Sequence, residues 1–405
     1  MPSRRDRGRA VVMGVRPSRA WMQMVAVTLV SALVVAGCGS TQGKESGPVS
    51  TETVKQLEDL MHARATAMGK GDRDGFLATI DSTRPAFRRI QLREFDYPSV
   101  RGTLASTFKI SAAERYGTYI RGFVEETLEG NAFAGAFNGG RAYYRHYFRN
   151  DGGKWLLTEP TGEETGSLRK KSSGDVAIGY WALDEDVSDV LLTALEDARR
   201  YAQGHAPKPV LAPMAVEFVP TAELAGPGWD GFRADKGVIG QISLLPWWWA
   251  FDATRTHVSA YTEMELRAQA LDVVRESVAP GIQARLLSEE WLNAGWIYFA
   301  TGLDVTGIVR QSCSGIAIPT LRELGAGFPP FGTPGVAPDA YGRFQGYASS
   351  MVAYLHERHG PDAYWRLMAA YAQSASAAVN FPKVIQTTPD DFYAAWLVWL
   401  KKKYC

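Results

Sequence analysis

Histidine and cysteine are scarce in this chain, which has six histidines and three cysteines among 405 residues. The string His-Glu-x-x-His, in which two histidines one helical turn apart bind zinc, does not occur. With so few cysteines, a metal site built on sulfur ligands is not expected either. The sequence therefore lacks the standard elements of a structural or catalytic zinc site.

Runs of one charge and long apolar runs are also few. The first 37 residues hold six arginines and one acid, so the rest of the chain has 38 basic and 42 acidic residues. Its longest basic runs are three residues long, Arg169-Lys170-Lys171 and Lys401-Lys402-Lys403, and nucleic-acid binding has no electrostatic support. No apolar stretch after residue 37 is long enough to span a bilayer.

The N-terminus has the layout of a secretory signal. An arginine-rich start is followed by an apolar run from Trp21 to Gly37 that is too short for a comfortable membrane span. The run ends in Val-Ala-Gly-Cys, which resembles the lipobox of bacterial lipoproteins, whose cysteine receives diacylglycerol. The resemblance implies a signal peptide over 1–37, a lipid anchor at Cys38 and a polar tether over 38–50. We expect the chain at the extracytoplasmic face of the cell membrane; the alternative is an uncleaved anchor helix with an incidental cysteine.

Two cysteines remain once the anchor has used Cys38. In an oxidising compartment Cys313 and Cys405 could form a disulfide. The alternative is a pair of free thiols, one of them at the C-terminus.

The polar segment 161–174, rich in glycine and serine and without periodicity, predicts a boundary between two domains. Before it, an amphipathic helix is expected over 52–68, with the Arg64 head reaching from the apolar face to water. A short helix follows that Asp72 or Asp74 would cap. Extended segments come next, including 108–123, 131–137, 141–150 and a strand after Asp151-Gly152-Gly153, a strong hairpin signal.

This first domain, 51–162, resembles the ketosteroid-isomerase-like, or nuclear-transport-factor-like, cone. The resemblance rests on the segment LEDLMHARATAMGKGDRDGFLATID, which is similar to the opening helices of that superfamily. Such cones include both enzymes and inert modules. A catalytic cone needs an acid or a His–Asp pair inside it. His146 lies on an expected strand, but the sequence assigns it no carboxylate partner.

The second domain, 175–405, is expected to begin with strands and to end as a helical bundle. Strands are predicted over 176–183, 214–220 and 237–245, and a helix over 186–203. From Tyr261 onward the pattern is helical almost to the end. The fold class is thus α+β: a curved-sheet cone with N-terminal helices, followed by a small sheet and a helical bundle of zinc-metallopeptidase type.

The helices of this second domain resemble those of the peptidase MA-like, or gluzincin, zinc metallopeptidases. Arg275-Glu276-Ser277-Val278-Ala279 stands where that family has His-Glu-x-x-His, so Arg275 and Ala279 replace the two histidine ligands. The segment WLNAGWIYF, 291–299, follows the family pattern WLxEGxAxY, with Ala294 in place of the third ligand, a glutamate. The resemblance implies that Glu276 is a vestige of the general base and that zinc is absent.

The expected function is therefore a non-catalytic pseudopeptidase that binds peptide or cell-envelope components. The old cleft would survive as a groove, and its candidate lining residues are Arg275, Glu276, Trp291, Trp296 and Tyr298. The alternatives are a divergent metallopeptidase or hydrolase and a small-ligand pocket in the N-terminal cone. His356 and His359, three residues apart, are the only tempting metal pair, but Gly360-Pro361 ends their helix at once.

Overall fold

The computed structural model describes most of the chain after residue 47, and residues 44–405 form one compact unit. The described residues are 48–96, 105–128, 141–208, 213–225, 233–234, 241–244, 251–286, 289–302, 305–311, 315, 317–327 and 340–405. The predicted signal peptide, Cys38, the strand expected over 131–137 and Cys313 lie outside these residues.

Three helices open the described chain. The first, α1 (Thr51–Lys70), is capped by Ser50, whose hydroxyl accepts from the Thr53 amide, and it confirms the predicted amphipathic helix. In α2 (Arg73–Leu77) the cap is Asp72, which accepts from the Gly75 amide at 2.9 Å. The third, α3 (Pro85–Asp96), was not expected from the sequence.

Four antiparallel strands follow as a meander, with the order β1-β2-β3-β4. Tight turns join them in pairs, and the glycines at 117, 152 and 153 have the positive φ angles that such turns require. The predicted hairpin at 151–153 is confirmed. The strands are β1 (Ala105–Tyr116), β2 (Tyr119–Leu128), β3 (Arg141–Asp151) and β4 (Lys154–Thr158).

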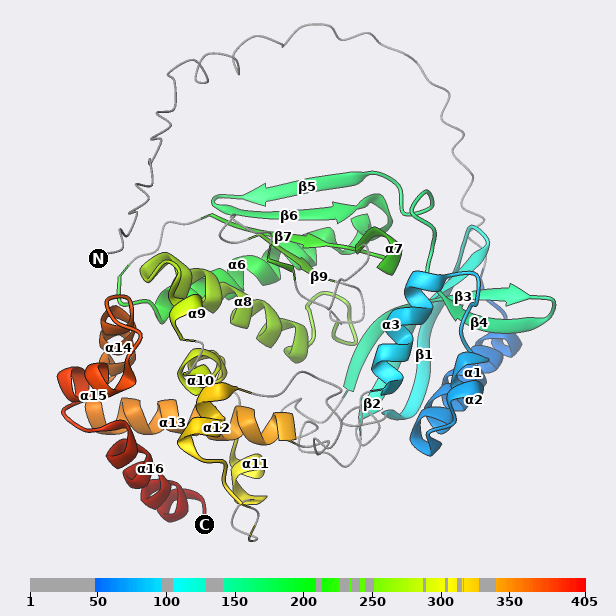
Figure 1. Ribbon diagram of the computed structural model, residues 1–405. Coiled ribbons are helices and arrows are strands. Elements are labelled where there is room, and N and C mark those ends of the chain that lie inside the picture. The colour runs from blue at the N-terminus through cyan, green and yellow to red at the C-terminus, as the bar shows by residue number, and fades with distance from the viewer. Residues whose placement is uncertain are drawn as a thin grey trace, which may run out of the picture. The chain divides into compact units, whose positions relative to one another are not determined.

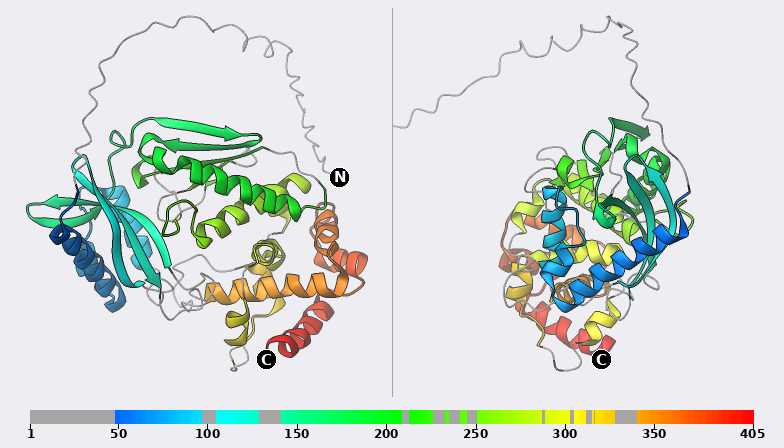
Figure 2. Two further views of the ribbon diagram at one scale, coloured as in Figure 1. Left: turned by 180° about the vertical axis from the view of Figure 1, so that it is seen from behind. Right: turned by 90° about the vertical axis from the view of Figure 1, so that its right-hand side faces the viewer.

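The register of this sheet separates two faces. Ile120 lies opposite Phe148, and both pack in a core with side chains of the helices α1 and α3 (Figure 2). Arg64 was expected to reach water, but it is only 8 % exposed. Its guanidinium lies 4.6 Å from the centre of the Phe76 ring and donates to Gln91, because α3 covers the place where water was expected.

The second sheet has the order β5-β6-β7-β9-β8 and mixes parallel with antiparallel pairs. Its strands are β5 (Leu168–Ser173), β6 (Val176–Trp181), β7 (Met214–Phe218), β8 (Arg233–Ala234) and β9 (Gln241–Leu244). Figure 1 shows β5 along the outer edge of the sheet. The strand β5 lies within the predicted boundary segment 161–174 and was not expected from the sequence. Because most side chains of β5 are exposed, the strand carries no apolar alternation that a sequence pattern could reveal.

Helices make up nearly all of the remaining described chain. A 3₁₀ turn, η2 (Ala182–Val187), leads into α6 (Ser188–Gly204), which packs against the second sheet (Figures 1 and 2). The others are α7 (Ala222–Ala225), α8 (Ala260–Val278), α9 (Ile282–Arg285), α10 (Glu290–Ala300), α11 (Thr306–Gln311), α12 (Leu321–Ala326), α13 (Ala340–His359), α14 (Ala363–Tyr371), α15 (Ala377–Ile385) and α16 (Pro389–Tyr404). The α+β class is thus confirmed. Within the described ranges no helix has both the length and the apolar character needed to cross a membrane.

A buried ion pair joins β3 to η2, on opposite sides of the predicted domain boundary. Arg145 donates to Asp184 at 2.6 Å, and both side chains are 2 % exposed. Asp186 accepts from Arg145 at 3.1 Å and pairs with Arg121 of β2 at 3.3 Å. The two sheets therefore belong to one interacting unit, and the boundaries 51–162 and 175–405 stay a prediction.

A second link between the two parts is Glu159, just after β4, which is 4 % exposed. Its carboxylate accepts from the Ala222 amide at 2.8 Å, at the start of α7. Burial raises the pKa of Glu159 to about 7, although amide donors and Arg84 act against the rise. The ordinary pKa is 4.5, so the folded state holds this proton over a pH range in which the unfolded chain releases it.

The free energy of unfolding should therefore fall as the pH rises from about 4.5 to about 7, by at most about 3 kcal/mol from Glu159. Glu159→Gln keeps one acceptor and has no proton to lose, so it should be more stable than the parent at pH 8. The difference should shrink by pH 5. Urea unfolding at both pH values measures this, with the exposed Glu163→Gln as the control. Parallel pH profiles for the parent and Glu159→Gln would contradict it.

Candidate functional site

The helices α8 and α10 carry the residues that the sequence placed in a degenerate zinc site, and they lie side by side at that point. Arg275 of α8 is completely buried. Its Nη1 donates to the carbonyl oxygen of Asn293 at 3.0 Å and to the Asn293 side chain at 2.5 Å. Arg275 of the first motif thus contacts Asn293 of the second motif, the residue directly before Ala294.

Acidic groups surround the Arg275 guanidinium. Its Nη2 forms an ion pair with Asp272, one turn earlier on α8. Burial acts to lower the pKa of Arg275, but Asp272, Glu290 and Glu276 outweigh it, and the net shift is upward. The guanidinium is therefore a fixed positive charge between the two helices.

Three carboxyl groups near this point have raised pKa values, and burial is the main cause for each of Asp272, Glu289 and Glu290. Glu289 accepts from the indole nitrogen of Trp291 at 2.9 Å, and Glu290 accepts from the Asn293 amide at 3.0 Å. Such a cluster of perturbed acids is common at functional sites but also occurs in structural ion-pair networks. The hydrogen bonds within this cluster favour the structural role.

Glu276 does not project freely toward a reacting group. Its Oε1 accepts from the backbone N–H of Gly281 at 2.5 Å, which closes the turn after α8. A carboxylate held in this way supports the helix terminus and has no electrophile beside it among the described residues. Ala279 lies at that helix end and is buried.

The aromatic residues expected to line a groove belong to the helical core instead. Trp291 is 0 % and Trp296 is 4 % exposed. The Trp296 ring stacks on Tyr364 of α14 at 4.8 Å between centroids. With Arg275 also buried, three of the five candidate groove residues have no surface to offer a peptide. Only Glu276 and Tyr298 are half-buried, because the closing helices cover α10 more completely than the sequence alone indicated.

The histidine pair at the end of α13 is likewise occupied by packing. The His356 ring lies 5.5 Å from that of Phe299, and Gly360 ends the helix with a φ of 92°. Between the two histidines, Glu357 accepts from Trp399 and Lys403 of α16, both at 3.0 Å. Within the ranges that the structure describes, no group of three or more potential metal ligands is present.

The four-stranded sheet holds the carboxylate partner that His146 lacked in the sequence. His146 Nε2 and Glu126 Oε1 are 3.1 Å apart, and the two side chains are 19 % and 20 % exposed. They share a face with Ile120 and Phe148, the face that α1 and α3 cover. The expected strand stopped at Phe123, whereas β2 continues to Leu128, and for this reason the partner was missed.

No family model matches the chain, and neither a curated protein nor a solved structure shows significant similarity to it. The resemblances to the cone and metallopeptidase families therefore stay predictions from the sequence motifs.

Proposed function

We propose that the chain is a lipid-anchored, extracytoplasmic binding protein whose second half is a metallopeptidase-like scaffold without catalytic activity. The observation that carries the proposal is the burial of Arg275 between α8 and α10. Its guanidinium supplies a positive charge where the two motifs meet, the place at which an active relative would hold a metal ion. Arg275 holds this charge in place through an ion pair with Asp272 and a hydrogen bond to Asn293.

The chemistry of this site argues against zinc-dependent hydrolysis. A guanidinium cannot act as a Lewis acid toward a bound water, and its two Nη groups donate to Asp272 and Asn293. The carboxylate of Glu276 is held by Gly281. The ligand class we propose is an extended peptide or another component of the cell envelope. Because Trp291 and Trp296 are buried, we expect the contact surface for such a ligand away from α10.

The lipid anchor is tested through Cys38. Cys38→Ser should move the protein from the membrane fraction to the soluble or secreted fraction, because no acyl chain can then be attached. Fractionation with Cys405→Ser as the matched cysteine control measures this. Membrane retention of Cys38→Ser would contradict the anchor.

Metal content tests the scaffold. The chain from residue 44 onward, purified without a metal-affinity tag, should carry less than about a tenth of an equivalent of zinc. The triple variant Arg275→His, Ala279→His, Ala294→Glu restores the three ligands of the family motif and should take up about one equivalent. The double variant that lacks Ala294→Glu is the matched control and should bind zinc more weakly.

The two arms of this experiment have different meanings. One equivalent of zinc in the unaltered chain, surviving dialysis, would contradict the non-catalytic proposal and favour a divergent hydrolase. A folded triple variant without zinc would contradict the resemblance of α8 and α10 to the metallopeptidase helices. A binding role would then need another basis.

A second candidate is small-ligand binding by the N-terminal part, and the His146–Glu126 pair favours it. A carboxylate beside an imidazole can orient it, and this pair lies on the face that such cones use for ligands. Native mass spectrometry of the chain from residue 44 should then show a small co-purifying ligand that His146→Leu loses. The exposed His257→Leu is the control. Equal ligand content in both variants would remove this candidate.

A further inference from the structure

The outer face of α3 borders a cavity that none of the roles above uses. Its volume is about 370 Å³, within the lower range of small-molecule sites. We call it the α3 trough, and its lining residues are Ser82, Pro85, Arg88, Arg89, Leu92 and Asp96. Four of them, from Pro85 to Leu92, follow helical spacing along one stripe of α3, opposite the buried Phe87, Gln91 and Phe95.

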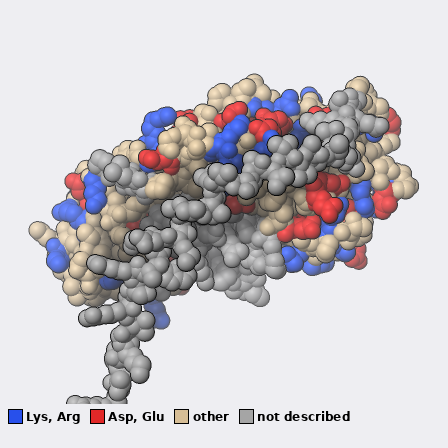
Figure 3. Space-filling model, turned by 90° about the horizontal axis from the view of Figure 1, so that it is seen from above, with Lys and Arg blue, Asp and Glu red and all other residues tan. Residues whose placement is uncertain are grey.

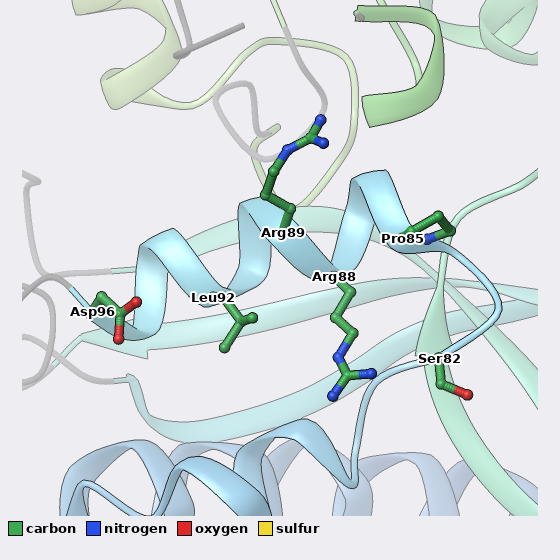
Figure 4. A pocket seen from close by; sticks show the side chains of 6 residues that line it. All are labelled: Ser82, Pro85, Arg88, Arg89, Leu92 and Asp96. Carbon is green, nitrogen blue, oxygen red and sulfur yellow. The ribbon is translucent and has the colours of Figure 1, made fainter. Parts of the chain in front are cut away.

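Two guanidinium groups flank the trough. In Figure 4 the side chains of Arg88 and Arg89 extend to opposite sides of α3, with Pro85 and Leu92 along the helix and Ser82 near its start. Within the described part of the chain, neither guanidinium has a hydrogen bond or an ion pair. This is unlike Arg84 one turn earlier, which donates to Tyr119 at 2.7 Å.

The one acid of the trough is already neutralised. Asp96 at its far end pairs with Arg73 of α2 at 2.6 Å. The trough therefore keeps two unpaired positive charges above a floor that Pro85 and Leu92 make apolar. The start of α3 lies at the other end of the trough, near Ser82 and Pro85, and the helix dipole adds a partial positive charge there.

We propose that the α3 trough binds a phosphate ester. A guanidinium fork suits the oxygens of a phosphate and each side of the trough carries one, the Ser82 hydroxyl can donate a further hydrogen bond, and the apolar floor suits the carbon part of the ester. A phosphate ester can reach this site as the headgroup of an anionic phospholipid or as a small soluble metabolite. The chemistry of recognition is shared, and the test separates the two sources.

The probes are glycerol 3-phosphate, followed by calorimetry, and phosphatidylcholine vesicles with and without phosphatidylglycerol, followed by co-sedimentation. The protein is the chain from residue 44, with its fold checked by circular dichroism. Arg88→Ala with Arg89→Ala should weaken binding at least tenfold. The matched control removes the same charge from two exposed arginines elsewhere, Arg310→Ala with Arg322→Ala, and should change binding less than twofold.

A second variant guards against a loss of fold. Leu92→Asp puts a carboxylate on the floor of the trough and should abolish binding while both arginines remain. Binding of vesicles alone, lost in the trough variants, supports a lipid headgroup, and binding of glycerol 3-phosphate supports a soluble ester. Absence of binding to either probe overturns the proposal. An equal loss in the trough variant and in the Arg310, Arg322 control also overturns it, because it would show diffuse attraction instead of a site.

Discussion

Replacing Arg145 with methionine should lower the free energy of unfolding by about 3–5 kcal/mol at neutral pH. The change leaves the carboxylate of Asp184 buried, at 2 % exposure, without the guanidinium that lies 2.6 Å from it. The cost of an uncompensated buried charge is the reason for the size of the effect. Urea unfolding followed by circular dichroism measures it.

The loss should depend on pH in a direction that identifies its cause. Burial raises the pKa of Asp184 to about 6 even with Arg145 acting to lower it. Without Arg145 the folded state will hold this proton to higher pH, so the variant should recover stability as the pH falls toward 5. A deficit that is equal at pH 5 and pH 8 would point to lost packing instead.

Two controls limit the interpretation. The double variant Arg145→Met, Asp184→Asn removes the isolated charge and should regain much of the lost stability. Lys55→Met breaks the exposed pair with Asp59, whose side chains are 66 % and 62 % exposed. It should cost much less than Arg145→Met, because water screens an exposed ion pair.

The second large effect concerns the C-terminal disulfide. Cys405 is disulfide-bonded, and its partner lies outside the described residues. If the partner is the predicted Cys313, the closed loop approaches the 100-residue case, for which chain entropy gives about 4.7 kcal/mol. Cys405→Ser should then lower the free energy of unfolding by about 2–4 kcal/mol, since measured values often fall below that figure.

Reduction supplies the control for this prediction. Dithiothreitol should lower the melting temperature of the parent and leave that of Cys405→Ser unchanged. Cys313→Ser should behave like Cys405→Ser, and the two changes together should cost no more than either alone. A Cys313→Ser protein that keeps the Cys405 disulfide would show that the predicted pairing is wrong.

Periodic elements could be predicted from the sequence, and elements defined by their neighbours could not. The helix α1 and the strand β6 have apolar residues at the spacing of their own secondary structure. The helix α3 does not, because its buried stripe runs from Phe87 through the polar Gln91 to Phe95. A glutamine is compatible with that core only because Arg64, from another helix, donates to it.

The candidate sites also combine features that the sequence could predict with features that depend on tertiary contacts. The contact of Arg275 with Asn293 joins the two motif segments, which lie on α8 and α10. The burial of Trp291 and Trp296 depends on α14 and α16, whose positions no local pattern gives. The unpaired state of Arg88 and Arg89 likewise depends on which acids the fold brings near them. Sequence supplied the residue types, whereas exposure and partners came from tertiary structure.

The outer strand β5 affects whether neighbouring copies of the protein associate edge to edge. If the proposed lipid anchor holds the chains on one membrane surface, their edges meet far more often than in dilute solution, and an open strand edge invites pairing with its like. Leu168 is 43 % exposed there, but Arg169, Lys170 and Lys171 follow it directly. Figure 3 shows positive and negative side chains interspersed on the face viewed from above, with neither sign forming a continuous field. Arg169 and Lys171 pair with Glu185 and Asp189 of the same chain, so a second copy that pairs along β5 would have to displace these ion pairs, and edge-to-edge association is disfavoured.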